Sequence, residues 1–254
     1  MKYEDMFKYN QGVVPDGVIR VSPSSIKDLI KNRPFWIKSN VLKIRKQDDM
    51  TNANIGTVLH AMIEGTYNGL YEEEILEAGL NYFEFTNSWR VSEMLKIMYS
   101  QWKEVYYPTD KEVKQNETWL EYQPNDKLIL SGTCDRISDG VIIDYKSSGS
   151  KISSIDSYRG QLYLYAWIAR KMGMDIHSVR VVGVPRPRWS DKTEKFGVCS
   201  VTSITEPIDE EYMSKLIADV KDAIQDIIQA CDSQEILNWI KSTEILNPYD
   251  RSDV

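Results

Sequence analysis

Apolar side chains in the N-terminal part of the chain recur at the spacing of amphipathic helices. The apolar residues of segment 52–67 fall on one helical face; they are Ile55, Val58, Leu59, Met62 and Ile63. The same spacing predicts helix at 26–30 and throughout 71–107, where Pro108 closes the segment. The sequence therefore predicts a helical N-terminal portion over about 1–110.

Beyond this portion the pattern changes to that of β-strands. The predicted strands share alternating or β-branched apolar residues; they span 118–122, 128–137, 141–146, 179–184 and 196–204. A helix predicted at 155–172 separates the first three strands from the last two, and a long apolar stripe predicts a final helix. Strands that alternate with helices favour an α/β fold.

The order of these elements also indicates how the chain is organised. No internal repeat, low-complexity tract or linker interrupts it, so we expect a single domain over 1–254. Within that domain about 111–205 would form the sheet, and about 206–254 the C-terminal helices. With 42% hydrophobic and 27% charged residues, the composition is that of a globular protein large enough to bury a core.

Several protein classes are excluded by what the sequence lacks. No run of apolar residues is long enough for a membrane-spanning helix. The N-terminus has neither the apolar core of a signal peptide nor the character of a transit peptide. The three cysteines are far apart and form no CxxC pair, which favours a reducing compartment. We therefore expect a cytoplasmic protein with no membrane partner.

The formal net charge of −7 argues, taken alone, against a nucleic-acid partner. The charge is uneven, however. Segment 159–195 has eight basic and three acidic residues, a balance of +5, while the segment from Glu206 onward has four basic and twelve acidic ones, a balance of −8. Two interpretations stay open: solvated surfaces of opposite sign, or a basic strip that faces an anionic ligand.

Asp139-Gly140 lies between two apolar runs and predicts a two-residue hairpin turn. In that register Asp135 lies opposite Asp144, and strand alternation places Lys146 on the same face. Two carboxylates about 5 Å apart in an apolar sheet repel each other. A divalent cation with oxygen ligands would compensate them; the alternative is a solvent-facing edge on which the carboxylates pair with Lys146.

Gly132-x-x-Asp135 followed by Ile143-Asp144-Tyr145-Lys146 resembles the core of the PD-(D/E)xK nucleases, in their RecB-like branch. Three further segments resemble elements of that branch in its order. They are Ser22-Pro23-Ser24-Ser25-Ile26 with Pro34-Phe35-Trp36, the GxxxH element Gly56-Thr57-Val58-Leu59-His60, and the QxxxY element from Gln161 to Tyr165. The resemblance implies a restriction-endonuclease-like core, in which helices flank a mixed central β-sheet.

The resemblance also implies roles for individual residues. His60, Asp135, Asp144 and the backbone carbonyl of Tyr145 would bind one or two Mg²⁺ or Mn²⁺ ions, and Lys146 would orient the attacking water. Gln161 and Tyr165 would support the site and contact the nucleic-acid backbone. Arg159 and Ser24 are expected as further nucleic-acid contacts. An additional acidic residue would be Glu117 or Glu121, and the spacing does not decide between these two.

The sequence departs from the RecB-like pattern at one position, and this indicates which subgroup of that branch it resembles. Several RecB-like relatives have a cysteine before the proline of the N-terminal signature, where this chain has Arg33. Three cysteines cannot form a four-cysteine cluster, so no iron–sulfur cluster is expected. The resemblance therefore points to phage-type or organellar exonucleases without that cluster.

The function implied is a metal-dependent DNA nuclease, an exonuclease that acts from single- or double-stranded DNA ends in recombination, repair or DNA degradation, with a recombination protein as a possible partner. Two alternatives stay open: an endonuclease or junction resolvase of the same fold, and a non-catalytic nucleic-acid-binding protein. Six aromatic residues of the helical portion could stack on bases, although most of them are expected in the core; they are Tyr67, Tyr71, Trp89, Tyr99, Trp102 and Tyr106.

Overall fold

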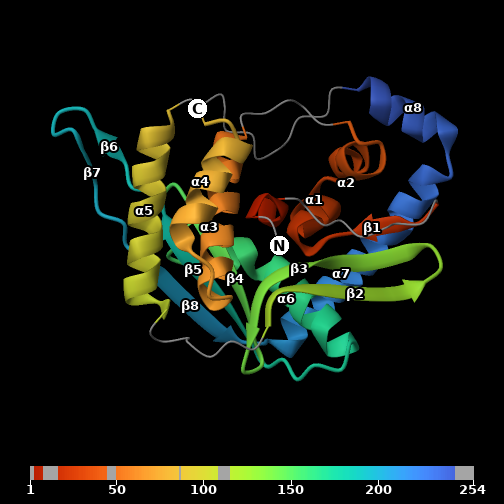
Figure 1. Cartoon of the computed structure of the whole chain (residues 1–254). Coiled ribbons are helices and arrows are strands. Elements are labelled where there is room, and N and C mark those ends of the chain that lie inside the picture. The colour runs from red at the N-terminus through yellow and green to blue at the C-terminus, as the bar shows by residue number, and fades with distance from the viewer. Residues whose placement is uncertain (1–2, 8–16, 45–49, 86, 108–114, 244–254) are drawn as a thin grey trace.

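The computed structural model describes residues 3–7, 17–44, 50–85, 87–107 and 115–243. Its centre is a mixed six-stranded sheet with helices on both faces (Figure 1). The strands of this sheet follow the order β1-β3-β4-β5-β8, and β2 pairs with β3. They are β1 (Ile19–Val21), β2 (Gln115–Asn125), β3 (Leu128–Ser138), β4 (Val141–Ser148), β5 (Ser178–Pro185) and β8 (Thr202–Pro207). The α/β fold expected from the sequence is confirmed.

Each face of the sheet is covered by its own group of helices. On one face a hydrophobic core forms with α3 (Thr51–Tyr67), α4 (Glu72–Tyr82), α5 (Ser88–Val105) and the 3-10 helix η1 (Tyr3–Phe7). On the other face the covering elements are α1 (Ile26–Lys31), α2 (Arg33–Trp36), the π-helix η3 (Ile37–Val41), α6 (Asp156–Lys171), α7 (Glu210–Cys231) and α8 (Gln234–Ser242). None of the helices in the described part of the chain is long and apolar enough to cross a membrane.

Alternation along the strands explains this two-sided arrangement. Ile142 and Val181 face the core that contains α6, whereas Ile143 and Val182 face the core that contains α3 and α5. A strand buried on both faces needs apolar residues at odd and even positions. In β4 the polar residues Asp144 and Lys146 interrupt that pattern on the α6 face.

The helical prediction for 71–107 is corrected in one respect. The segment forms two helices, α4 and α5, because the chain leaves the helical conformation after Tyr82 and Glu84 adopts a positive φ of 49°. A positive φ is incompatible with a continuing right-handed helix. The strand predicted at 196–204 is also divided: the short β7 (Lys195–Phe196) pairs with β6 (Trp189–Ser190), and β8 begins only at Thr202.

The β3–β4 hairpin has the predicted turn and register. Asp139 and Gly140 have positive φ values of 48° and 73°, and Arg136, Ile137 and Ser138 pair with Ile143, Ile142 and Val141. Beyond Arg136 the two strands separate, so Asp135 and Asp144 do not form the expected pair in the ladder. On the same edge, β1 pairs only with Leu128–Leu130 of β3. Within the described residues, 131–135 of β3 therefore have no strand partner on that edge, and we call this opening the fork.

Candidate active site

Asp144 lies on β4 at the fork and is only 2% exposed. Lys146, two residues further along the same strand, places Nζ 3.0 Å from Asp144 Oδ1 and 2.9 Å from Oδ2. From α6, Gln161 Nε2 donates a hydrogen bond of 3.0 Å to Oδ1. The alternation that put Asp144 and Lys146 on one face is thus observed, and α6 adds Gln161 to them.

Asp135 occupies the β3 side of the fork. Its Oδ2 accepts a hydrogen bond of 2.6 Å from the backbone N–H of Tyr145, and its Oδ1 lies 3.5 Å from Nδ1 of His60 on α3. The side chain of Asp135 thus replaces the backbone partner that Tyr145 would have in a continuous ladder. The N–H and C=O of one strand residue point to the same side, so the carbonyl of Tyr145 also faces the fork.

Glu117, which the sequence left as one of two candidates, completes this cluster. The pairs Asn116–Arg136 and Thr118–Cys134 place it opposite Asp135, and ligand atoms of His60, Glu117 and Asp135 all lie within 4.8 Å of one another. Its φ of 44° is a strained value for a residue with a side chain. Glu121 lies elsewhere, where its carboxylate accepts a hydrogen bond from Trp119 Nε1.

A register shift in β2 explains why the sequence alone could not place Glu117 opposite Asp135. Asn125 pairs with Leu128 across a tight turn, but the register shifts between Asn125 and Tyr122, which pairs with Leu130. Extending the turn's register without this bulge would place Glu117 opposite Arg136, on the wrong face of the strand. A bulge adds one residue to one strand and so reverses the facing of all that follows.

The closely spaced charges of the fork alter one another's protonation. Burial lowers the pKa of His60, but attraction to the Asp135 and Glu117 carboxylates outweighs it and raises that pKa to about 9. Burial, together with repulsion from Asp135, raises the pKa of Glu117 to about 8. The pKa of Asp135 is lowered, because its interactions with His60 and Lys146 exceed the effect of burial. When all of these groups are ionised, the carboxylates of Glu117, Asp135 and Asp144 outnumber the cations of His60 and Lys146.

The pKa values of the two charged residues on the β4 side of the fork are also shifted. Burial raises the pKa of Asp144 to about 6, although Lys146 opposes the shift. The pKa of Lys146 is raised despite burial, because Asp144 and Asp135 favour its charged form.

These residues fit a divalent cation. The donors are hard oxygens with one imidazole, which is a set that Mg²⁺ and Mn²⁺ accept. The buried Oδ2 of Asp144 makes no hydrogen bond to a described residue, although Lys146 faces it. The Lys146 ammonium compensates the charge of Asp144 only in part, because burial and the neighbouring Asp135 still raise the pKa of Asp144, so a bound cation would stabilise its ionised form. His60, Glu117, Asp135 and Asp144 therefore form a candidate metal site.

Three predicted residues lie outside this cluster. Tyr165 is 5% exposed, and its hydroxyl donates a hydrogen bond of 2.6 Å to the carbonyl of Thr133, which ties α6 to β3. Arg159 forms two hydrogen bonds to Glu206, at 2.7 and 2.8 Å. Ser24 is exposed in the 3-10 helix η2 (Pro23–Ser25), where its hydroxyl lies 3.0 Å from that of Ser22.

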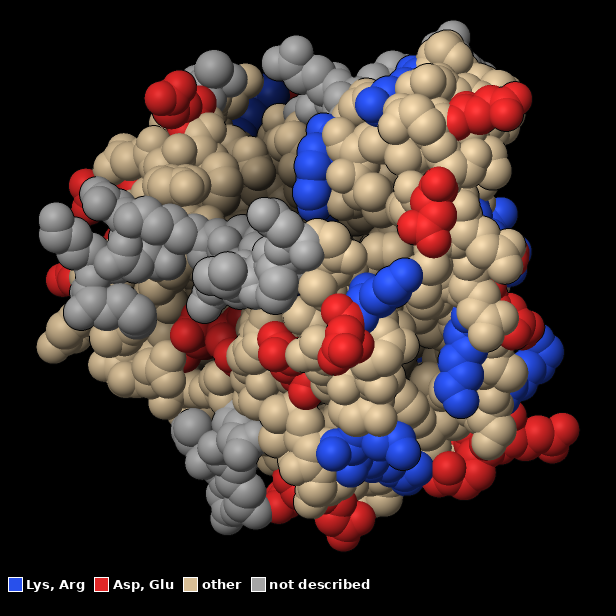
Figure 2. Space-filling view, turned by 90° about the vertical axis from the view of Figure 1, so that its right-hand side faces the viewer, with Lys and Arg blue, Asp and Glu red and all other residues tan. Residues whose placement is uncertain are grey.

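Two arginines of the basic segment form ion pairs with acidic residues. Arg159 and Arg170 pair with Glu206 and Glu210, so part of the +5 segment is neutralised by the acidic C-terminal segment. On the face shown in Figure 2, basic and acidic groups are interspersed. The sequence left open two interpretations, solvated surfaces of opposite sign or a basic strip that faces an anionic ligand. Neither of them includes ion pairs between the basic and the acidic segment.

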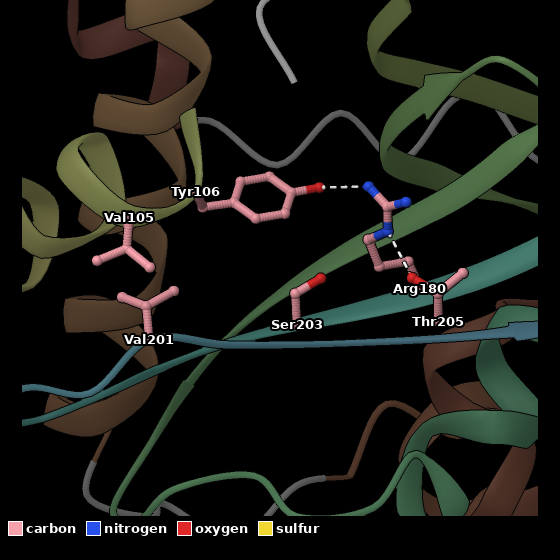
Figure 3. Close-up of a pocket in the computed structure, with 6 residues that line it drawn as sticks. All are labelled: Val105, Tyr106, Arg180, Val201, Ser203 and Thr205. Carbon is pink, nitrogen blue, oxygen red and sulfur yellow. Dashed lines mark hydrogen bonds between the residues drawn. The ribbon is translucent and has the colours of Figure 1, made fainter. Parts of the chain in front are cut away.

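A separate pocket of about 270 Å³ lies between the end of α5 and β8 (Figure 3). Arg180 donates hydrogen bonds to the Thr205 hydroxyl (2.7 Å) and to the Tyr106 hydroxyl (3.1 Å). Arg180 pairs with Ile143 and shares its face of the sheet, whereas Asp144 points to the other face. The pocket is therefore not part of the fork.

Comparisons with known proteins concern the family and the fold of the chain. The family model described as the PD-(D/E)XK nuclease superfamily matches residues 20–239. No curated protein matches the sequence. A solved structure from Eubacterium rectale, assigned as an exonuclease, aligns with a TM-score of 0.56 at 14% identity, over 89% of this chain and 88% of that one.

Two other solved structures are more distant. An alkaline exonuclease from Laribacter hongkongensis has a TM-score of 0.41 at 10% identity, over 89% of this chain and 92% of that one. A phage related exonuclease from Haemophilus somnus 129PT has a TM-score of 0.41 at 15% identity, over 85% of this chain and 96% of that one. The family model spans most of the chain, and the Eubacterium rectale structure shares the fold. The chain therefore belongs to the PD-(D/E)XK nuclease superfamily, whose members use divalent metal ions.

Proposed function

We propose that this nuclease is a deoxyribonuclease dependent on Mg²⁺ or Mn²⁺, and that it removes nucleotides from DNA ends. The observation that carries the proposal is the fork, where carboxylates from three strands meet one imidazole and one half-buried ammonium group. A non-catalytic DNA-binding protein has no need for such a cluster, because carboxylates repel the phosphates that it must bind.

The residues that would hold the cation are His60, Glu117, Asp135, Asp144 and the carbonyl of Tyr145. When bound, the cation supplies a water of lowered pKa and neutralises negative charge that develops on the phosphate.

Lys146 would act directly on the reacting groups. Its raised pKa keeps it cationic at neutral pH, so it can donate hydrogen bonds to the attacking water and to a phosphate oxygen. Donors fixed in advance at the point where charge develops contribute strongly to catalysis. Asp144 holds the ammonium group in place through both of its oxygens.

Gln161 and Tyr165 would act as positioning residues. Gln161 fixes the orientation of the Asp144 carboxylate through the hydrogen bond to Oδ1. Tyr165 anchors the same helix to β3 beside the fork. For Arg159 and Ser24, by contrast, no contact with the carboxylate cluster supports the predicted role in binding nucleic acid.

The preference for DNA ends is supported by the named activity of the similar structure from Eubacterium rectale. The test compares linear end-labelled DNA with covalently closed circles, each single- and double-stranded, in Mg²⁺, in Mn²⁺ and in EDTA. We expect linear DNA to be degraded to mononucleotides or short products in either metal, and circles to persist. The Asp144→Asn variant serves as the inactive control.

The same assay distinguishes the alternatives. Cleavage of closed circles would replace the exonuclease with an endonuclease or resolvase. If neither metal supports cleavage of any substrate, the catalytic proposal is wrong and a binding protein of this fold remains.

A further inference from the structure

A group of aromatic rings, of which Trp89 is exposed and Trp189 and Phe196 are half-buried, lies where the β6–β7 hairpin meets α5. Trp89 of α5 contacts Trp189 of β6 with ring centres 5.3 Å apart, and Trp189 contacts Phe196 of β7 at 5.1 Å. The guanidinium carbon of Arg90 lies 4.9 Å from the centre of the Trp189 ring and 5.4 Å from that of Trp89. We call Trp89, Arg90, Trp189 and Phe196 the tryptophan platform.

These side chains do not belong to the core of the protein. Trp89 is 54% exposed, whereas Trp102 on the same helix is fully buried. Within the described residues, neither hydrophobic core includes Trp89, Trp189 or Phe196. The rings therefore pack on one another and on Arg90. Large aromatic side chains that are left in solvent in this way commonly mark a binding surface.

The platform lies close to the fork along the chain. Lys146 pairs with Gly183 of β5, and Trp189 follows Gly183 by six residues, a span of at most about 20 Å. Arg186, between them, donates a hydrogen bond of 3.1 Å to Ser147 Oγ, directly after Lys146. In Figure 1 the hairpin lies beside the end of α5 that is remote from β8. At about 3.4 Å per nucleotide, roughly six nucleotides would span this distance.

The charge around the platform suits a polyanion. Arg90 and the basic residues of segment 188–195 make four positive charges, and the segment has two acidic residues. Arg90 lies 3.7 Å from Asp191, whose side chain is 89% exposed, so solvent screens this pair. Aromatic faces combined with cations are the elements by which proteins bind single-stranded nucleic acid.

We propose that the platform binds unpaired nucleotides of a DNA strand, with a base stacked on Trp89 and the backbone near Arg90. This inference rests on the proposed function, because the strand in question is the one that the fork would cleave. An unpaired base offers both of its ring faces to an indole, whereas the interior bases of a duplex are already stacked on each other and only its two terminal pairs present one face. The platform would therefore favour single strands.

The experiment measures dissociation constants by fluorescence anisotropy in EDTA, so that no cleavage takes place. The probes are a fluorescein-labelled single strand of about twelve nucleotides and a blunt duplex of the same sequence. We expect Trp89→Ala to weaken binding of the single strand about fivefold or more, the loss of one stacked base. Binding of the duplex should change less than twofold, and Trp89→Phe should retain most of the affinity.

The chain offers a matched control in Trp239 of α8, which is also 54% exposed. Trp239→Ala should leave both dissociation constants unchanged, and thermal melting checks that each variant is folded. The proposal is overturned if the wild-type protein does not bind single strands, if Trp89→Ala binds them as tightly as the wild type, or if the two tryptophan variants behave alike.

This outcome is independent of the catalytic one. A protein that degrades DNA but whose Trp89→Ala variant binds single strands normally would retain the proposed function and lose the platform. A protein that cleaves nothing, yet binds single strands through Trp89, would retain the platform and lose the nuclease activity.

Discussion

Asp144 has a buried charge that two side chains hold in place, Lys146 from its own strand and Gln161 from α6. Its pKa is raised to about 6, so the folded protein binds this proton more tightly than the unfolded chain does. Above that pH the ionised carboxylate therefore lowers the free energy of unfolding. Catalytic groups are commonly kept in such costly environments.

We expect Asp144→Asn to lower the cleavage rate by at least about 1000-fold without lowering the melting temperature at pH 7.5 in EDTA. The amide keeps the shape of the side chain and removes a charge that the fold disfavours. Cleavage of end-labelled DNA and thermal melting test the two parts separately. A variant that retains a tenth of the wild-type rate would contradict the role of Asp144.

Glu117 and Glu121 provide a test of the additional acidic residue. Glu117 lies with His60 and Asp135, whereas Glu121 does not. We expect Glu117→Gln to raise the metal concentration needed for half-maximal cleavage by about tenfold or more. Titration with Mn²⁺, by activity and by calorimetry without DNA, measures this change. If Glu121→Gln raised the required metal concentration equally, the position of Glu117 opposite Asp135 would not be the cause of the effect.

At the level of side chains, Asp135, Asp144 and Lys146 could be predicted from their spacing around the hairpin turn, whereas His60, Gln161 and Tyr165 were predicted from the family resemblance. Asp144 and Lys146 are two residues apart on one strand, and a tight turn relates β3 to β4. Glu117 could not be chosen, because the register of β2 depends on a bulge that no local pattern indicates.

Among the elements, β3 is approached closely by η2 and α6 at Gly132. A Cβ atom at this position would lie 3.0 Å from Pro23 Cδ and 3.3 Å from the ring and hydroxyl of Tyr165. A proline ring and a buried tyrosine have little freedom to move. The glycine of the GxxD pattern therefore lets a helix and a 3-10 turn contact the strand next to the fork.

We expect Gly132→Ala to lower the free energy of unfolding by about 1–3 kcal/mol and to reduce cleavage, because α6 carries Gln161. Urea denaturation measures the first effect. The matched control is Gly160→Ala on α6, where the new Cβ would lie 3.5 Å from Ile26 and 3.9 Å from Leu216, at ordinary contact distance. Equal stability of the Gly132 variant and the wild type would refute the close approach.

The limits of α1, α3, α6 and the central strands β3, β4 and β5 followed closely from apolar periodicity. The division between α4 and α5 did not, because it depends on the backbone conformation at Glu84, which has a positive φ. The expected strand at 196–204 failed for a related reason. Its first residues belong to the β6–β7 hairpin and the segment after it, which lie outside the central sheet.

For the molecule as a whole, the excess of carboxylates at the fork links metal binding to stability. A ligand that binds only the folded state raises the free energy of unfolding, by about 2.7 kcal/mol at one hundred times its dissociation constant. We expect Mn²⁺ to raise the melting temperature of the wild type accordingly, and to have much less effect on Asp135→Asn. A melting temperature that does not respond to either metal would contradict a metal site at the fork.

The fork also divides the sheet into two parts. Three residue pairs, from Arg136–Ile143 to Ser138–Val141, join β3 to β4. Asp135 belongs to the part with β1 and β2, and Asp144 to the part with β5 and β8. A ligand held by both carboxylates would therefore act as a tether that restrains the two parts against each other. Backbone amides along β3 and β4 should then exchange with deuterium more slowly in the metal-bound protein than in the metal-free protein. The exchange rates of the sheet would therefore report whether the site is occupied.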